Sequence, residues 1–161
     1  MGDACDHHHH DGPPDAAAVA TALAAADARL TGEGERMTAA RLRVLELLLT
    51  AGEPVKAYDL IARFGEDGQP AKPPTVYRAL EFLERKGLAH RIASISAYVA
   101  CSSGKADHAA AFLICDCCGA TREVSATLAE GLDGAAAAAG YAIARTTIEA
   151  HGRCSACRIP V

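Results

Sequence analysis

The sequence predicts an α+β protein with two lobes: a helical lobe ending in two short strands, and a smaller α/β lobe. Apolar residues recur at helical spacing in the first part of the chain, whereas short apolar runs and two cysteine pairs fill the last part. With 161 residues the chain has room for one domain or two small lobes. Because only 4% of the residues are aromatic, the core must be built from aliphatic side chains.

The first two helices are predicted from apolar spacing and from capping residues. An alanine-rich helix is expected over residues 15–30, where the inward positions are Val19, Leu23, Ala26 and Leu30. Thr38 can cap a second helix, and Gly52 can stop it. The face that this second helix is expected to bury consists of Leu42, Leu45, Leu48 and Leu49.

A third and a fourth helix follow, and then a ribbon of two strands. Residues 57–64 predict the third helix, and its inward side chains are Leu60, Ile61 and Phe64. The fourth begins at Pro73 and Pro74, because proline is tolerated in a first helical turn, and it ends at Gly87. Short strands are expected over residues 88–92 and 97–100. Three helices followed by a two-stranded ribbon is the order of a winged helix-turn-helix.

The second lobe is expected to alternate strands with one helix. We expect strands over 111–115, 121–124 and 141–150, and a helix over 127–139. The domains predicted are a disordered His-rich tail that includes His7 and His10, a winged helix, a polar hinge and the α/β lobe. Their bounds are residues 1–14, 15–100, 101–104 and 105–161.

Charge is unevenly distributed along the chain. Residues 1–35 carry one basic and seven acidic residues (−6), residues 36–100 ten and seven (+3), and residues 101–161 five and six (−1). The middle segment therefore permits a nucleic-acid partner without requiring one. Since no apolar run is long enough to span a membrane and the N-terminus is acidic, we expect a cytoplasmic protein without a membrane partner.

Two C-x₂-C pairs carry the strongest chemical signal. Cys115 and Cys118 form the first pair, Cys154 and Cys157 form the second, and 35 residues lie between the two pairs. Two such turns can supply the four soft ligands of a tetrahedral zinc site. The alternative is a pair of redox dithiols, but the first pair follows a strand instead of opening a helix, which favours structural zinc. Cys117 is expected to be a spare thiol that points away.

Three separated motifs resemble the ferric uptake regulator family, and most closely its zinc-sensing branch. The motifs are AKPPTVYRAL at 71–80, FLICD-x-CG at 112–119 and IEAHG-x-C-x-x-C at 148–157, and the resemblance extends over about residues 16 to 157. It implies a homodimeric winged-helix repressor of zinc-uptake genes whose C-terminal lobe forms the dimer. It also implies double-stranded operator DNA as partner, no small-molecule substrate, and Zn²⁺ at two sites per subunit.

The resemblance assigns ligands to both zinc sites. The structural site is implied to be Cys115, Cys118, Cys154 and Cys157, and the regulatory site His90, Cys101, His108 and Glu123. Taken singly, a lone histidine is more often a surface residue, Glu123 a solvated strand residue and Cys101 a small buried hydrophobe. One thiolate, two imidazoles and one carboxylate together suit Zn²⁺. His151 is interpreted as support for the adjacent cysteine pair.

The helix over residues 74–86 is the expected DNA reader. Its first residues would enter the major groove, where Arg78 can donate to guanine. Further contacts to phosphate or to thymine methyl groups are expected from Tyr58, Lys72, Thr75, Tyr77 and Arg91. For Tyr77 the competing interpretation is packing in the core.

Two alternatives remain open at this stage. An iron, manganese or peroxide sensor of the same family would differ in metal content and inducing ion, although Cys101 and the single His108 favour zinc over iron. A thiol oxidoreductase would need an accessible thiolate of low pKa, whereas four zinc-bound thiolates are occupied. Because the chain has no evident catalytic triad, phosphate loop or carboxylate pair, we do not expect an enzyme.

Overall fold

The structure, a computed structural model, describes residues 14–65, 70–102, 109–125 and 130–158. These residues form two compact units, an N-terminal unit up to residue 102 and a C-terminal unit from residue 109. The predicted tail lies almost entirely outside the described residues, as does half of the predicted hinge, so those domain bounds stay predictions. Among the described residues, no helix is long and apolar enough to cross a membrane.

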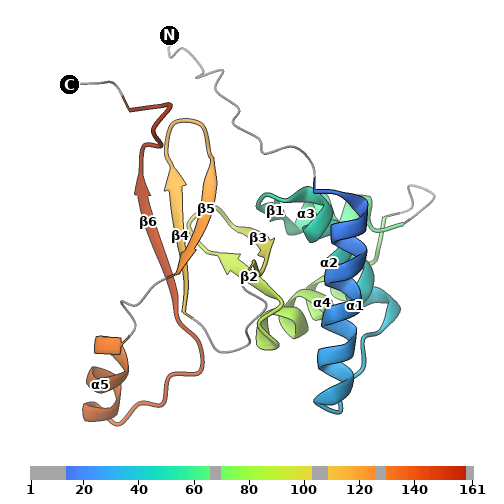
Figure 1. The fold of residues 1–161 in the computed structure, drawn as a ribbon, viewed down its shortest axis with the longest axis horizontal. Coiled ribbons are helices and arrows are strands. Elements are labelled where there is room, and N and C mark those ends of the chain that lie inside the picture. The colour runs from blue at the N-terminus through green and yellow to red at the C-terminus, as the bar shows by residue number, and fades with distance from the viewer. Residues whose placement is uncertain (1–13, 66–69, 103–108, 126–129, 159–161) are drawn as a thin grey trace. The chain divides into compact units, whose positions relative to one another are not determined.

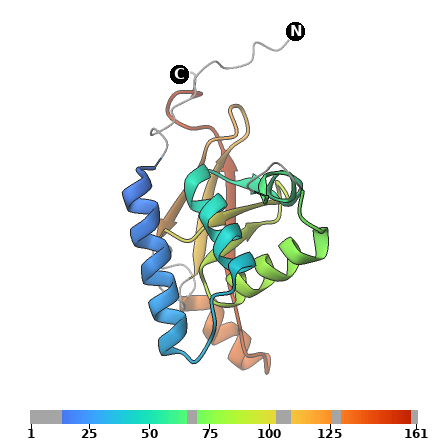
Figure 2. The ribbon, with the colours of Figure 1, turned by 90° about the vertical axis from the view of Figure 1, so that its right-hand side faces the viewer.

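Four helices form most of the N-terminal unit (Figure 1). They are α1 (Ala16–Gly32), α2 (Ala39–Ala51), α3 (Ala57–Arg63) and α4 (Pro73–Arg85). Both predicted ends of α2 are confirmed: Thr38 Oγ1 accepts a hydrogen bond from the Arg41 N–H at 3.4 Å, and Gly52 adopts a φ of 63° after the last turn. The side-by-side helices α1 and α2 are seen in Figure 2.

The core of this unit is aliphatic, as the composition predicts. Side chains that are wholly buried come from all four helices, and they include Leu30, Val44, Leu48, Leu60, Val76, Leu80 and Leu83. One expected core position is wrong: Leu42 is 39% exposed, and Val44 is buried instead. The apolar face of α2 is wide enough for either Leu42 or Val44 to point inward. Packing of α2 against α1 and α4 buries Val44.

Three strands complete the N-terminal unit. The ribbon of β2 (Ala89–Ile92) and β3 (Ala97–Ala100) is joined by β1 (Val55–Lys56), and the antiparallel order is β1-β3-β2. The strand β1 was not predicted, because two residues cannot show an alternating pattern. It forms through its pairing with β3, in which Val55 lies opposite Tyr98.

The C-terminal unit is a three-stranded sheet with one helix. Its elements are β4 (Ala110–Cys115), β5 (Thr121–Ser125), α5 (Glu130–Ala138) and β6 (Thr147–Gly152). The strand order is β5-β4-β6, with β5 antiparallel and β6 parallel to the central β4. Parallel neighbours need a crossover connection, which here contains α5.

The strand expected over residues 141–150 is wrong at its start. Gly140 adopts a φ of 76° and the Tyr141 N–H returns to the Ala136 carbonyl at 2.8 Å, so the chain closes the helix at this point. Pairing with β4 begins only where Thr147 lies opposite Ala110. The apolar residues before Thr147 therefore lie outside the sheet. The first three residues of the expected helix 127–139 fall outside the described residues.

Candidate metal centres and DNA-binding surface

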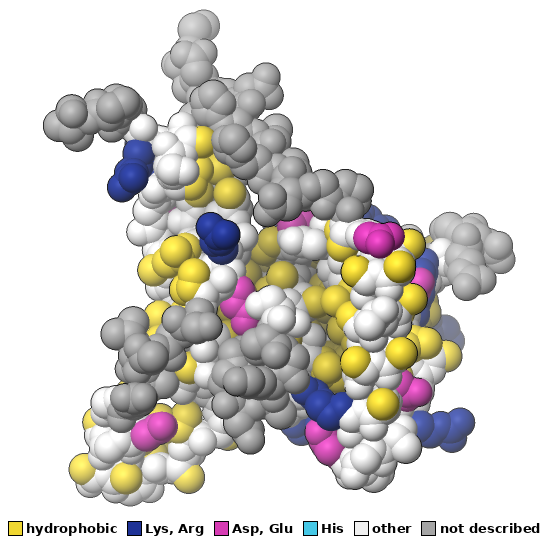
Figure 3. All heavy atoms as spheres, in the orientation of Figure 1, with side chains coloured by type: hydrophobic (Ala, Val, Ile, Leu, Met, Phe, Trp, Pro, Cys, Tyr) yellow, Lys and Arg dark blue, Asp and Glu magenta, His cyan; other side chains and the backbone are white. Residues whose placement is uncertain are grey.

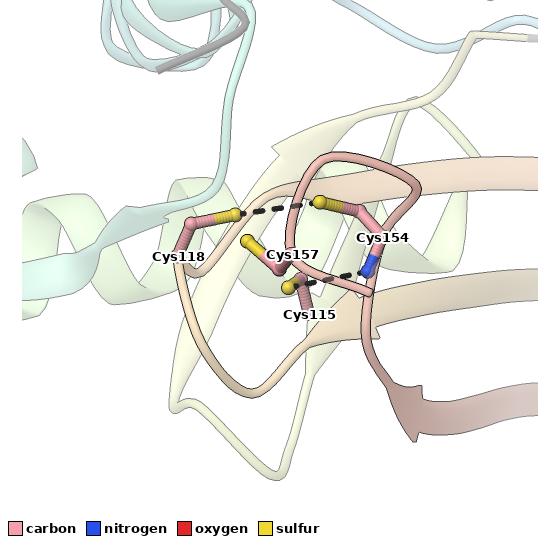
Figure 4. A group of neighbouring side chains, drawn as sticks. All are labelled: Cys115, Cys118, Cys154 and Cys157. Atoms are coloured by element: carbon pink, nitrogen blue, oxygen red, sulfur yellow. Dashed lines mark hydrogen bonds between the residues drawn. The ribbon is translucent and has the colours of Figure 1, made fainter. Parts of the chain in front are cut away.

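The four paired cysteines lie at one end of the C-terminal sheet. Cys115 is the last residue of β4 and Cys118 lies in the turn after it, while Cys154 and Cys157 lie in the turn after β6. We call residues 115–118 the first cysteine turn and residues 154–157 the second. Because β4 and β6 are parallel neighbours, with Cys115 opposite Gly152, the two turns follow the strands at the same end of the sheet. Their side chains point toward one another in Figure 4.

The geometry of these thiols fits a tetrahedral metal ion. The four Sγ atoms lie within 4.8 Å of one another, and those of Cys118 and Cys154 are 3.8 Å apart. A tetrahedron with Zn–S bonds of about 2.3 Å has its sulfur atoms about 3.8 Å apart. Cys115 and Cys157 are buried and the other two are half-buried, so the cluster is largely shielded from water. Four converging thiols therefore form a site that zinc fits.

Backbone hydrogen bonds prepare one thiol for metal binding. The backbone N–H groups of the turns, first that of Cys118 and then that of Cys154, lower the pKa of Cys115 to about 6. The Cys154 N–H is 3.4 Å from the Cys115 sulfur. Burial instead raises the pKa of Cys157. Without a metal, negative charge in the cluster at neutral pH therefore resides first on Cys115.

Other residues near the four cysteines have distinct positions. Cys117 is exposed and is not one of the four converging thiols. His151 Nδ1 lies 3.0 Å from a carboxylate oxygen of Asp116, which belongs to the first cysteine turn. We did not single out Asp116 from the sequence. Its position inside a C-x₂-C pair was the available signal, but only the strand pairing shows that it faces His151.

Two of the four residues assigned to the regulatory site meet within the N-terminal unit. His90 on β2 is 6% exposed, and one of its ring nitrogens lies within 4.8 Å of the Cys101 thiol. The Cys101 N–H donates to the Leu88 carbonyl at 3.0 Å, which continues the β2–β3 pairing by one step. Glu123 is half-buried on β5 of the other unit, and His108 lies outside the described residues.

The candidate DNA contacts lie mainly on exposed positions. Val76, Ala79 and Leu80 of α4 are buried, which leaves Tyr77 and Arg78 on its outer side. Tyr77 is 45% exposed and Tyr58 on α3 is 78% exposed, so both phenol rings can reach a ligand. Lys72 and Arg91 are exposed as well, whereas Thr75 is half-buried.

Comparison with known proteins decides the family. The sequence model of the ferric uptake regulator family matches residues 32–151. The chain belongs to the ferric uptake regulator family. The zinc uptake regulation protein of Escherichia coli (strain K12) is 42% identical over 127 residues, which cover 76% of this chain and 72% of that protein. The protein of the same name from Mycobacterium tuberculosis (strain CDC 1551 / Oshkosh) is 31% identical over 133 residues, covering 80% of this chain and 99% of that protein.

Solved structures of this family share the fold. A zinc uptake regulator complexed with zinc and DNA is 40% identical, with a TM-score of 0.78 over 86% of this chain and 94% of the other. A structure described as holo XcZur is 38% identical, with a TM-score of 0.75 over 85% of this chain and 96% of the other. The predicted α+β fold, an N-terminal winged helix-turn-helix followed by a small α/β lobe, is confirmed. Since this is a family of regulators, the chain is not an enzyme.

Proposed function

We propose that this chain is a zinc-responsive, DNA-binding transcriptional repressor of zinc-uptake genes, with zinc as its corepressor. The observation that carries the proposal is the 40% identity and TM-score of 0.78 shared with a zinc uptake regulator that was solved with zinc and DNA. The identity of 42% to the E. coli zinc uptake regulation protein supports the same metal. Convergence of four thiols supports zinc at a structural site as well, because zinc favours sulfur ligands more than hard six-coordinate ions do.

The four-cysteine cluster would hold a structural zinc ion. Cys115, Cys118, Cys154 and Cys157 supply a closed shell of four sulfur ligands, which leaves no position for a substrate. An ion bound there would join the ends of β4 and β6 through the two cysteine turns. Structural zinc contributes folding free energy outright, so this ion would stabilise the C-terminal unit.

A second, regulatory zinc site would consist of His90, Cys101, His108 and Glu123. Its support is the pairing of an imidazole and a thiol at the end of the β2–β3 ribbon, where the His90 ring and Cys101 Sγ are within ligand-sharing distance. Because the remaining donors belong to later parts of the chain, a bound ion would link the N-terminal and C-terminal units. Such a link would restrict the arrangement of the DNA-reading unit.

The chain would act as a homodimer on double-stranded operator DNA. Exposed apolar side chains of the C-terminal unit offer an apolar surface for a second copy, and they are Leu113, Leu132, Tyr141 and Ile143. Hydrophobic side chains on α5 are visible at the lower left of Figure 3. Two copies would place two α4 helices in successive major grooves. A repressor of this kind works beside the chromosome, so we also propose a cytoplasmic location.

The test is operator binding at controlled free metal concentrations. The purified dimer should bind DNA from the upstream regions of zinc-uptake genes when the free zinc concentration is buffered above the dissociation constant of the regulatory site. Chelation should release the DNA. Equal or better activation by iron or manganese, or loss of binding with peroxide alone, would instead assign the chain to another sensing class of the family. Absence of any metal-dependent DNA binding would contradict the proposal.

A further inference from the structure

A side-chain hydrogen bond joins the first cysteine turn to the end of β6, just before the second cysteine turn, without using a cysteine. His151 Nδ1 and Asp116 Oδ1 are 3.0 Å apart, although 35 positions separate the residues. A carboxylate can only accept, so the Nδ1–H of His151 is the donor. Asp116 lies between the two cysteines of the first turn, and His151 lies three residues before the second turn. The bond therefore connects the two halves of the four-cysteine site.

Backbone pairing places these two side chains opposite each other. His151 lies opposite Ile114 in the parallel β4–β6 pairing, and Cys115 lies opposite Gly152. One step beyond, the Asp116 N–H donates to the Gly152 carbonyl at 2.8 Å. Asp116 is thus held by two hydrogen bonds, one from its backbone N–H to Gly152 and one from His151 to its carboxylate. Both bonds therefore tie the first residue after β4 to the end of β6.

We propose that Asp116 and His151 are a positioning pair that holds the two cysteine turns in ligand geometry and thereby slows loss of the metal. The inference rests on the proposed structural zinc site. A metal leaves a four-thiolate site by releasing ligands one after another, and the freed thiolate must stay close for rebinding. A tie between the turns keeps the second pair of cysteines beside the first during such a step. Groups that orient metal ligands commonly change metal affinity by about 10- to 100-fold.

If the pair only stabilised the fold, its loss would mainly lower the thermal stability of the metal-loaded chain. The Asp116 and His151 side chains are 60% and 39% exposed, and exposed ion pairs contribute little to global stability. The pair should therefore influence retention of the metal much more than the thermal unfolding of the metal-loaded chain. This difference separates a positioning pair from an ordinary surface contact.

The experiment compares metal release from the full-length, metal-loaded chain with release from five variants of it. Cobalt(II) substituted for zinc reports four-thiolate ligation through its d–d and sulfur-to-cobalt absorption, and loss of that absorption to excess chelator gives the release rate. Asp116→Ala and His151→Leu should each release metal about 10-fold faster. The double variant should release no faster than either single variant, because the two residues act through one bond. Asp133→Ala, the same change at an exposed position of α5, should match the unsubstituted chain.

A conservative variant keeps the proposal falsifiable. His151→Asn retains an N–H donor near the position of Nδ1 and should restore slow release, whereas His151→Leu should not. Equal release rates for these two variants, additive effects in the double variant, or unchanged release in both single variants would overturn the positioning role. If the unsubstituted chain itself showed no four-thiolate cobalt spectrum, the structural zinc site would fail instead, and the two failures are thereby distinguished.

Discussion

The Sγ atoms of Cys118 and Cys154 lie 3.8 Å apart, although 36 positions separate them in the chain. They are brought together because β4 pairs in parallel with β6, which places the two cysteine turns at the same end of the sheet. A connection that contains α5 runs between these strands. A metal ion bound by both turns would link the chain just after β4 to the chain just after β6. Metal binding and folding of the C-terminal unit should therefore be coupled.

Cys154→Ser tests this coupling. The variant should lose its structural zinc, and its C-terminal unit should unfold or cease to dimerise, because structural zinc supplies an apparent ~10–16 kcal/mol. Zinc content and size-exclusion chromatography measure both effects. Cys117→Ser is the matched control: it changes an exposed thiol that is not one of the four converging thiols, and it should keep both zinc and dimer. A soluble Cys154→Ser dimer with full operator binding would reject the structural site.

Zinc affinity at the four-cysteine site should depend on pH more steeply in acid than at neutrality. Because the pKa of Cys115 is lowered to about 6, chiefly by the Cys118 backbone N–H, zinc displaces almost no proton from it above pH 7. Below pH 6 Cys115 is protonated in the metal-free chain, so one additional proton must leave, and the affinity should lose about a further tenfold per pH unit. Cys157, whose pKa is raised by burial, releases a proton throughout.

Chelator competition across this pH range gives the slope directly. Serine at position 115 removes the titrating group but also a ligand, so the comparison is made within the unsubstituted chain. A single slope from acid to neutral pH would show that Cys115 has no depressed pKa in solution.

Arg78→Ala should reduce operator affinity by ~1–3 kcal/mol and relax selectivity at one position of each half-site, because a bidentate contact to guanine is lost. Binding to the operator and to a set of single-base variants measures the change. Lys72→Ala provides the comparison, since loss of a phosphate contact should weaken all sequences alike and reduce the salt slope by about 1. If Arg78→Ala behaved like Lys72→Ala, Arg78 would contact the backbone rather than a base.

Cys101→Ser should leave a folded dimer that keeps the four-cysteine zinc but gains no DNA affinity when zinc is added. Moving an equilibrium from 1:99 to 99:1 requires a preference of about 5.5 kcal/mol for one state, which metal–ligand bonds between the units can supply. Metal stoichiometry and zinc-dependent operator binding test the expectation, with Cys117→Ser as the same chemical change elsewhere. A Cys101→Ser chain that loses no zinc, or that still responds to zinc as the unsubstituted chain does, would end the regulatory assignment.

The sequence by itself determined the helices of the N-terminal unit and the membership of the four-cysteine cluster. Capping is local, so Thr38 and Gly52 mark the ends of α2 wherever the helix packs. Ligand spacing is also local, because two cysteines three positions apart lie on one turn whatever surrounds them. The family was evident from the motifs at 71–80, 112–119 and 148–157, since they retain both the residue types and their order.

Tertiary structure decided which apolar segments pair and which face is buried. Residues 141–146 are apolar enough for a strand, but β4 offers a partner only from Thr147 onward. Val55 and Lys56 form a strand because β3 lies beside them. Val44 is buried in place of Leu42 because packing against the neighbouring helices decides which face of α2 points inward. The contact between Asp116 and His151 likewise follows from the β4–β6 register. Pairing between distant segments depends on the hydrogen bonds and packing of the whole fold, and local residue patterns do not encode that register.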